Sequence, residues 1–426
     1  MNGVNQSLTA EVMSTDELVQ LIRGSLLNTP RVQAIAPQAA KVPQTAAAFQ
    51  ADLPVAAPIT NSTSKPSRFY ALVFAVATIV GLVGVWKGNT TYGPEMYGAT
   101  GMVPVAEAHA SNKNYAVFDL NLNIRALRDQ QLARLSKTPE IILLGASHWQ
   151  EGHRGIAQGL DFFNAHIHRD YWEDLLGMVD LLIRHDRLPK KLIISIRDNQ
   201  FAPVGKRKDF LWEPGIPAYR EMAARLGIEP ESYWKTLPYD RMRALLSLPM
   251  LFDNLTRWHN ASERPGPTDS KQSENLDMLL PDGSIVWSAV HKQLFSQERA
   301  MRESIAFVNK RLNDPPVVDP KGVAAFDTLL TFLKEKGVEV YLINPPFNPI
   351  FYDAVQGSPY AEGLGRIETL MQDIATRHNI PLLGSFNPHK IGCEAVMYID
   401  AEHSNEKCLT KLLEPFVAMQ RAKGGA

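Results

Sequence analysis

A serine follows a short apolar run, 141–144, and the two small residues Gly145 and Ala146. Such a run is typical of a strand buried on both faces, and the small residues let the backbone turn sharply at its carboxyl end. In open α/β sheets, substrates bind at that end of the strands. Ser147 is therefore a candidate nucleophile. Its other interpretation is as the N-cap of the next helix, a position that serine favours.

An acid and an imidazole stand near the far end of the chain, at Asp400 and His403. A serine hydroxyl is a weak nucleophile at neutral pH and needs a base within hydrogen-bond reach. His403 can accept the proton of Ser147 if a carboxylate holds its other ring nitrogen, which Asp400 is placed to do. The alternative is structural, with Asp400 or Ser404 capping a helix expected over 406–420.

Alternating strand and helix patterns must bring these residues together. We predict strands at 140–144, 161–164, 191–196, 338–343 and 380–383, and helices at 119–137, 171–185, 320–336 and 363–378. Alternation of this kind indicates an α/β fold with a mainly parallel sheet flanked by helices.

The interval 201–299 interrupts this alternation, and we expect it to be a mostly helical insertion. It is rich in arginine and holds four tryptophans: Trp212, Trp234, Trp258 and Trp287. Aromatic residues with arginines can line a carbohydrate groove, but they can equally pack into a small core of the insertion itself.

The N-terminal part indicates a membrane anchor. Residues 1–68 are rich in Ala, Pro, Ser and Thr, which predicts a largely disordered arm, with one amphipathic helix at 14–27 that could dock another protein. Residues 69–86 carry no charge and are long enough to span a bilayer. Lys65 and Arg68 precede this run, so we expect the N-terminus in the cytoplasm. A linker at 87–118 then leads to an outer domain at 119–426.

Composition and charge exclude several classes. The 426 residues are 45% hydrophobic and carry a formal net charge of −1, which argues against a nucleic-acid partner. No nucleotide-binding or zinc-ligand spacing appears, and we predict no cofactor and no metal. His166 and His168 form one H-x-H pair, whose side chains would share a face of a strand and offer a weak metal signal.

The two cysteines, Cys393 and Cys408, bracket the acid and the imidazole. If the domain lies outside the cytoplasm, they can form a disulfide that restricts the loop between them. Alternatively, they are two separate buried thiols, which behave as small apolar side chains.

The serine after a buried strand, together with the terminal Asp400-x-x-His403, resembles the SGNH/GDSL hydrolase superfamily. Within it, the chain is most similar to membrane-anchored envelope proteins that move acyl groups, in teichoic-acid D-alanylation and exopolysaccharide O-acetylation. The resemblance covers about 140–199 and 338–420. It implies that Ser147 is the nucleophile, that His403 is the general base and that Asp400 orients His403.

The same resemblance implies groups that bind the oxyanion or the substrate. Asn199 matches the family's oxyanion asparagine, although the glycine and the last aspartate of that block are absent. Asn164 stands where the second block usually has a glycine amide, and any non-proline residue there still has a backbone N–H. Asn344, after the predicted fourth strand, could donate to substrate, or could simply form a turn before Pro345.

We therefore expect a serine O-acyltransferase in the bacterial inner membrane, with its main domain in the periplasm. Its substrates would be an acyl carrier and an envelope or secreted glycan, and its partner a multi-span membrane acyltransferase or a polysaccharide synthase. Two alternatives remain: an esterase or deacetylase with the same triad, and a non-enzymatic scaffold subunit of a polysaccharide synthesis or secretion complex.

Overall fold

The structure is a computed structural model. It describes residues 68–92, 99–118, 122–168, 170–203, 215–230, 245–260 and 263–424. The chain divides into two compact units, 1–84 and 85–426. Apart from residue 68, the predicted arm and its helix at 14–27 lie outside the described residues.

Helix α2 (Arg68–Tyr92) contains the predicted membrane span. Its segment Tyr70–Thr91 is long and apolar enough to cross a membrane, judged by length and composition. The large apolar side chains of this helix are exposed, with 75% of Phe74 and 65% of Val80 accessible. A surface of this kind is unfavourable in water and suits contact with lipid.

The parallel sheet predicted from the sequence is confirmed. Its strands are β3 (Phe162–Asn164), β2 (Ile141–Leu144), β4 (Lys191–Ser195), β8 (Glu339–Asn344) and β9 (Leu382–Gly384), in that order across the sheet. Every neighbouring pair is parallel. The first two strands along the chain run to one edge and the later ones to the other, so the order reverses between β2 and β4. In open α/β sheets, this reversal opens a crevice at the carboxyl ends of the two strands.

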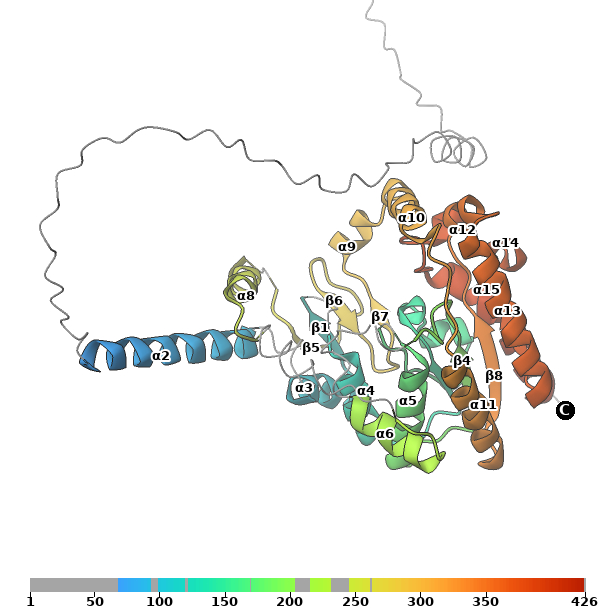
Figure 1. Cartoon of the computed structure of the whole chain (residues 1–426), viewed down its shortest axis with the longest axis horizontal. Coiled ribbons are helices and arrows are strands. Elements are labelled where there is room, and N and C mark those ends of the chain that lie inside the picture. Colours follow the sequence, from blue (N-terminus) through green and yellow to red (C-terminus); the bar gives the residue numbers. More distant parts are fainter. Residues whose placement is uncertain are drawn as a thin grey trace, which may run out of the picture. The chain divides into compact units, whose positions relative to one another are not determined.

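Helices cover both faces of this sheet (Figure 1). On one face, α15 (Glu406–Gly424) and the short helix η3 (Arg154–Ala157) pack against alternate strand residues such as Ile141, Ile193 and Ile343. The intervening strand residues are also buried and point the other way. Helix α11 (Pro320–Glu335) packs against β8, and it lies beside both α5 (Trp172–Arg184) and α13 (Pro359–His378).

A second sheet corrects two expectations. It is antiparallel, with the order β5 (Gly266–Thr268), β1 (Asn114–Val117), β6 (Asp277–Leu279) and β7 (Ile285–Val286). The predicted linker 87–118 thus contains β1, and the insertion at 201–299, predicted to be mostly helical, contributes the other three strands. These strands are only two to four residues long, and β1 pairs with β5 and β6 across about 150 residues, so the alternation of strands and helices did not indicate this sheet.

The predicted linker also contains helix α3 (Ala99–Ala110), which packs on α4 (Ile124–Arg134). Small residues such as Ala106 and Ala108 are buried there. The expected linker is therefore partly helical, because small side chains allow two helices to approach closely.

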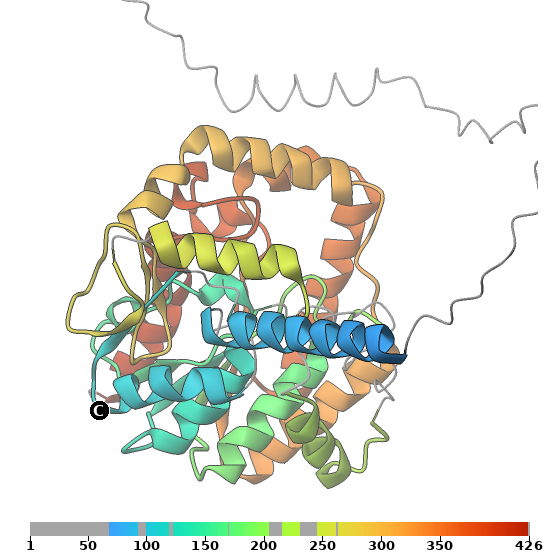
Figure 2. The same ribbon diagram turned by 90° about the vertical axis from the view of Figure 1, so that its left-hand side faces the viewer.

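The remaining described helices are α6 (Ile216–Arg225), α8 (Leu248–Asn260), α9 (Ala289–Leu294), α10 (Gln297–Arg311), α12 (Pro349–Val355) and α14 (Pro388–Ile391). Figure 2 shows α10 running along the edge of the domain. Of the insertion's tryptophans, Trp258 packs edge-on against Phe118, and Trp287 packs edge-on against Phe295. These two side chains therefore contribute to packing within the insertion and its neighbours, while Trp212 and Trp234 lie outside the described residues.

Candidate active site

Ser147 stands at the carboxyl end of β2, next to the point where the strand order reverses. It is the first residue of the short helix η2 (Ser147–Trp149), whose N-cap is Ala146. Gly145 is required for this turn, because an added Cβ would lie 2.7 Å from the Cβ of Ser195, at the end of β4. The serine therefore does not act as an N-cap, and its hydroxyl is directed elsewhere.

The structure brings Ser147, His403 and Asp400 together. The Oγ of Ser147 lies 2.8 Å from Nε2 of His403, and Nδ1 of His403 lies 2.7 Å from Oδ2 of Asp400. Because a carboxylate only accepts, Nδ1 carries the proton of the second contact, and Nε2 of the neutral ring is then free to accept from the serine hydroxyl. This is the arrangement in which an imidazole can remove a proton from serine.

Asp400 also shapes the turn that carries His403. Its Oδ1 accepts hydrogen bonds from the backbone amides of Glu402 and His403, each at 2.8 Å. The backbone N–H of Ile399 donates to the carbonyl of His403 at 2.9 Å and closes the turn. One carboxylate oxygen thus holds the backbone while the other holds the imidazole.

The predicted helix cap by Asp400 or Ser404 is wrong. The cap of α15 is Asn405, whose Oδ1 accepts from the backbone N–H of Lys407 at 3.0 Å. Asp400 does not cap the helix because both of its carboxylate oxygens bind within the preceding turn, to the backbone amides of Glu402 and His403 and to the ring of His403.

Asn348 supports the same turn from the other side and was not singled out from the sequence. Its Nδ2 donates to the carbonyl of Asp400 at 3.0 Å, and its backbone N–H donates to the carbonyl of Ala401 at 3.0 Å. Its Oδ1 accepts from the N–H of Ile350 and so caps α12. The only sequence signal was an asparagine before Pro349 at the start of a helix, which indicates a cap and not a contact with a distant loop.

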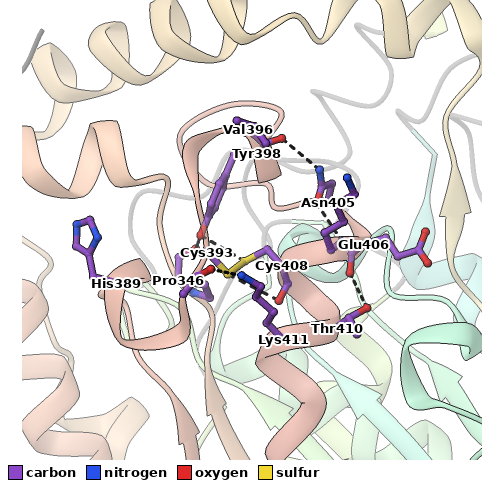
Figure 3. The surroundings of a disulfide bond; sticks show 12 residues. Pro346, His389, Cys393, Val396, Tyr398, Asn405, Glu406, Cys408, Thr410 and Lys411 are labelled. Atoms are coloured by element: carbon purple, nitrogen blue, oxygen red, sulfur yellow. Dashed lines mark hydrogen bonds between the residues drawn. A yellow bond between two sulfur atoms is a disulfide. The ribbon is translucent and has the colours of Figure 1, made fainter. Parts of the chain in front are cut away.

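Cys393 and Cys408 form a disulfide (Figure 3). Both residues are buried. Tyr398 packs beside the bond, with its hydroxyl 3.5 Å from Sγ of Cys408, and it donates to the carbonyl of Pro346 at 3.4 Å. The bond joins the segment that carries the acid and the imidazole to the first turns of α15.

The charges of the pair stabilise each other. Burial is the largest single influence on the pKa of His403 and lowers it, but the charge and hydrogen bond of Asp400, together with the charge of Glu402, raise that pKa to about 9. Burial alone would raise the pKa of Asp400, but His403 and the two backbone amides hold it well below its usual range. His403 keeps 24% of its side chain exposed, so a substrate can approach it.

The three predicted oxyanion or substrate asparagines all lie at the carboxyl edge of the sheet, but they differ in what they hold. Asn164 is fully buried, and its Nδ2 donates to the carbonyls of Trp149 and Gly152, so its side chain fixes the loop after Ser147. Asn199 is half-buried, and its Nδ2 donates to Oδ2 of Asp198 at 2.9 Å. Asn344 is buried at the end of β8.

A buried charged cluster beside the triad was not predicted from the sequence. It consists of the buried Asp198 and the half-buried Arg197 and Glu402, with Nε of Arg197 3.8 Å from Oδ1 of Asp198. The hydroxyl of Tyr360 donates to Oδ2 of Asp198 at 2.7 Å. Burial and the Asp198 carboxylate raise the pKa of Glu402, while Arg197 opposes that shift. In the sequence, charged residues are frequent around Asn199 and around His403. No known residue spacing indicates that these two distant segments form one site.

Histidines also gather near the serine. The ring of His148 lies 5.8 Å from the ring of His403, and the rings of His166 and His168 lie 5.9 Å apart. Burial lowers the pKa values of His148 and His166 well below the usual range, so both are neutral. Nδ1 of His166 lies 3.1 Å from a guanidinium nitrogen of Arg128. Within the described part of the chain, no group of three or more His, Cys, Asp or Glu side chains is arranged to hold a metal ion.

Comparisons of the sequence with protein-family models and with curated proteins found no match.

Proposed function

We propose that this protein is a membrane-anchored serine acyltransferase of the SGNH hydrolase type, which moves an acetyl or similar acyl group to a hydroxyl of an envelope or secreted polysaccharide. The observation that carries the proposal is the 2.8 Å contact between Oγ of Ser147 and Nε2 of His403, made across 256 positions of the chain. A serine and an imidazole in that relation, with the imidazole held by a carboxylate, form the machinery of acyl transfer.

The reaction proceeds in two half-reactions. Oγ of Ser147 attacks the carbonyl carbon of the acyl donor while His403 accepts the hydroxyl proton at Nε2. The bond to the leaving group breaks, and His403 returns the proton to that group. A glycan hydroxyl then attacks the acyl-serine, His403 accepts its proton, and the serine oxygen leaves and is reprotonated. Asp400 stabilises the imidazolium that forms in each half.

Helix α2 provides the anchor for this chemistry. With Lys65 and Arg68 before the apolar run, the positive-inside rule favours a cytoplasmic N-terminus and an outer catalytic domain in the periplasm of the bacterial inner membrane. A disulfide in the domain agrees with an oxidising compartment. Activated acyl thioesters are cytoplasmic, so a multi-span membrane partner would carry the acyl group across.

The oxyanion that forms in each half-reaction needs donors. Asn199 is the side-chain candidate, but in the resting structure its amide donates to Asp198. Removal of one oxyanion donor costs about 3 kcal/mol of transition-state stabilisation. We therefore expect Asn199 to release Asp198 when substrate binds, or the enzyme to be slow.

Covalent labelling tests the nucleophile. Wild-type protein should form one adduct with a serine-directed fluorophosphonate, detected by intact mass, and Ser147→Ala should form none while keeping the wild-type circular dichroism spectrum. Ser296→Ala is the matched control, because Ser296 is an exposed helix cap far from the triad in sequence, and it should label normally. A wild-type protein that never labels would favour the scaffold alternative.

Acceptor dependence separates transfer from hydrolysis, since the contacts of the triad are common to both. Purified protein with a simple acetyl ester should release acetate slowly, and an oligosaccharide acceptor should accelerate ester consumption and gain an acetyl group in the mass spectrum. Hydrolysis that no acceptor changes would make the protein an esterase or deacetylase.

A further inference from the structure

We propose that α8 is an interfacial helix whose exposed apolar face lies in the headgroup region of the lipid bilayer that α2 crosses. The inference goes beyond acyl transfer, and it rests on the proposed membrane span. Three features carry it: an exposed apolar face, a charged face opposite, and a direct attachment to the end of α2.

The apolar face consists of Leu248, Phe252 and Leu255. Their exposed fractions are 52%, 65% and 36%. Residues four and three positions apart lie on the same side of a helix, so the three side chains form one ridge. Large apolar side chains gathered in this way mark a surface that contacts a partner or a membrane.

The rest of α8 is divided between water and protein. Asp253 and Arg257 form an exposed ion pair at 2.7 Å on the side opposite the apolar ridge. Asn254 is buried, and Trp258 packs against Phe118. The helix therefore has a charged face, a face that packs on the domain and a largely exposed apolar face, which is the pattern of helices that lie in the plane of a membrane surface.

The last turn of α2 holds α8. Nδ2 of Asn89 donates to the carbonyls of Leu245 and Ser247, at 2.8 and 3.0 Å, and its Oδ1 accepts from Nδ2 of Asn254 at 3.2 Å. Asn89 is fully buried by these contacts. Gly88 lies against the end of the Leu251 side chain, so the two helices are also in contact there.

This attachment sets the depth of α8. The uncharged run of α2 ends at Trp86, and Asn89 stands one helical turn later, about 4.5 Å further along the axis. If 69–86 cross the hydrocarbon core, Asn89 lies among the lipid headgroups. A helix bonded to Asn89 then lies at the same depth, where its apolar side chains can enter the acyl boundary. Both views show α8 on the outside of the domain (Figures 1 and 2).

Site-directed spin labelling of the full-length protein in lipid nanodiscs tests the proposal. The native disulfide stays oxidised, so a single introduced cysteine takes the nitroxide. Phe252→Cys reports the apolar face, Asp253→Cys is the matched control one position away on the charged side, and Val80→Cys in α2 reports the span. Power saturation compares collisions with oxygen, which concentrates in lipid, and with a water-soluble nickel chelate.

We expect a severalfold higher ratio of oxygen to nickel accessibility at position 252 than at 253, with position 80 highest. A lipid-exposed label at 80 with an aqueous label at 252 would overturn the interfacial helix and leave the span intact. A label at 252 shielded from both reagents would also overturn it, because a protein would then cover the face. An aqueous label at position 80 would reject the span itself.

Discussion

His403 connects the two other members of the triad and sets their protonation. When the ring is neutral, its Nδ1 proton is held by Asp400 and its Nε2 lone pair faces Oγ of Ser147. The same carboxylate raises the pKa of the imidazole to about 9, although burial alone would lower it. The resting pair is therefore mostly an imidazolium and a carboxylate at neutral pH, and only the deprotonated ring can act as a base.

This pKa predicts the pH dependence of activity. A base must be unprotonated, so kcat/KM should rise with pH on an acid limb whose midpoint lies near pH 9, well above the midpoint near 6.5 of an ordinary histidine. The pH dependence is measured by steady-state hydrolysis of a simple acetyl ester between about pH 5 and pH 10, a range in which the folded protein should persist. A rate independent of pH across that interval would contradict the role of His403 as the base.

Asp400→Asn is the control for that profile. Without the carboxylate the imidazolium loses its partner, so the acid limb should move to lower pH, and kcat should fall by about 10⁴-fold because the ring is no longer held in the productive tautomer. A variant that kept both the wild-type limb and the wild-type rate would show that Asp400 does not orient His403.

The loop between Cys393 and Cys408 is the element that places the acid and the base. It is closed by the disulfide, by the turn hydrogen bonds of Asp400 and by the contacts of Asn348. Its far end continues into α15, which packs on the same sheet that ends in Ser147. Rigid attachment on both sides limits the entropy that the triad must lose when it reacts.

Removal of the disulfide should therefore lower both stability and activity. For Cys393→Ala/Cys408→Ala, the lost constraint on a loop of 15 residues is about 3 kcal/mol of unfolding free energy. We expect a lower melting temperature in a thermal-shift assay and a lower kcat with a smaller change in KM. Wild-type protein treated with dithiothreitol is the parallel sample, and unchanged melting in both would show that Asn348 and the turn suffice.

The turn at Gly145 is the second critical element, because β4 leaves no room beside it. In Gly145→Ala, the new Cβ would lie 2.7 Å from Cβ of Ser195 and 3.2 Å from Trp149, so the strands or the turn must shift. We expect a loss of about 1–3 kcal/mol in unfolding free energy and a strong loss of phosphonate labelling at Ser147.

Gly365→Ala is the matched substitution for Gly145→Ala. Gly365 lies on the exposed side of α13 with nothing within 4 Å of an added Cβ. Alanine favours a helix over glycine by about 1 kcal/mol, so this variant should be as stable as the wild type or more stable, and fully active. Equal effects of the two substitutions in denaturant titrations would argue against a steric limit at Gly145.

The molecule as a whole joins an apolar helix to a parallel α/β domain with a small antiparallel sheet beside it. The fold brings distant parts of the α/β domain together, since β2 is followed by Ser147 and the segment after β9 carries Asp400 and His403. If the proposed function and span are right, α2 keeps this site near a membrane-bound acyl donor, which raises the effective concentration of the donor.

The direction of the anchor can be tested in whole cells. With an N-terminal epitope tag, protease added to spheroplasts should remove the outer domain and leave the tag and α2 protected, because Lys65 and Arg68 before the apolar run predict an N-terminus in the cytoplasm. Detergent-permeabilised spheroplasts, in which the tag is also digested, are the control. A tag lost from intact spheroplasts with the domain protected would reverse the orientation.

Much of this protein follows from local patterns. Alternating apolar strands and amphipathic helices predicted the parallel sheet, because the hydrophobic periodicity of a strand or helix depends only on the residues within it. The order of a buried strand, two small residues and a serine, with Asp400 and His403 at the far end, was enough to nominate the triad. The uncharged run 69–86 was enough to nominate the span.

Other features depended on contacts between distant segments. The antiparallel sheet pairs β1 with strands about 150 residues later, and its short strands carry no period of their own. The support of Asp400 by Asn348, the charged cluster of Arg197 and Glu402, and the attachment of α8 to Asn89 are likewise long-range. The sequence determines which side chains can donate or accept a hydrogen bond or carry a charge. Their partners depend on the tertiary structure, because a hydrogen bond forms only between atoms that folding brings within about 3 Å.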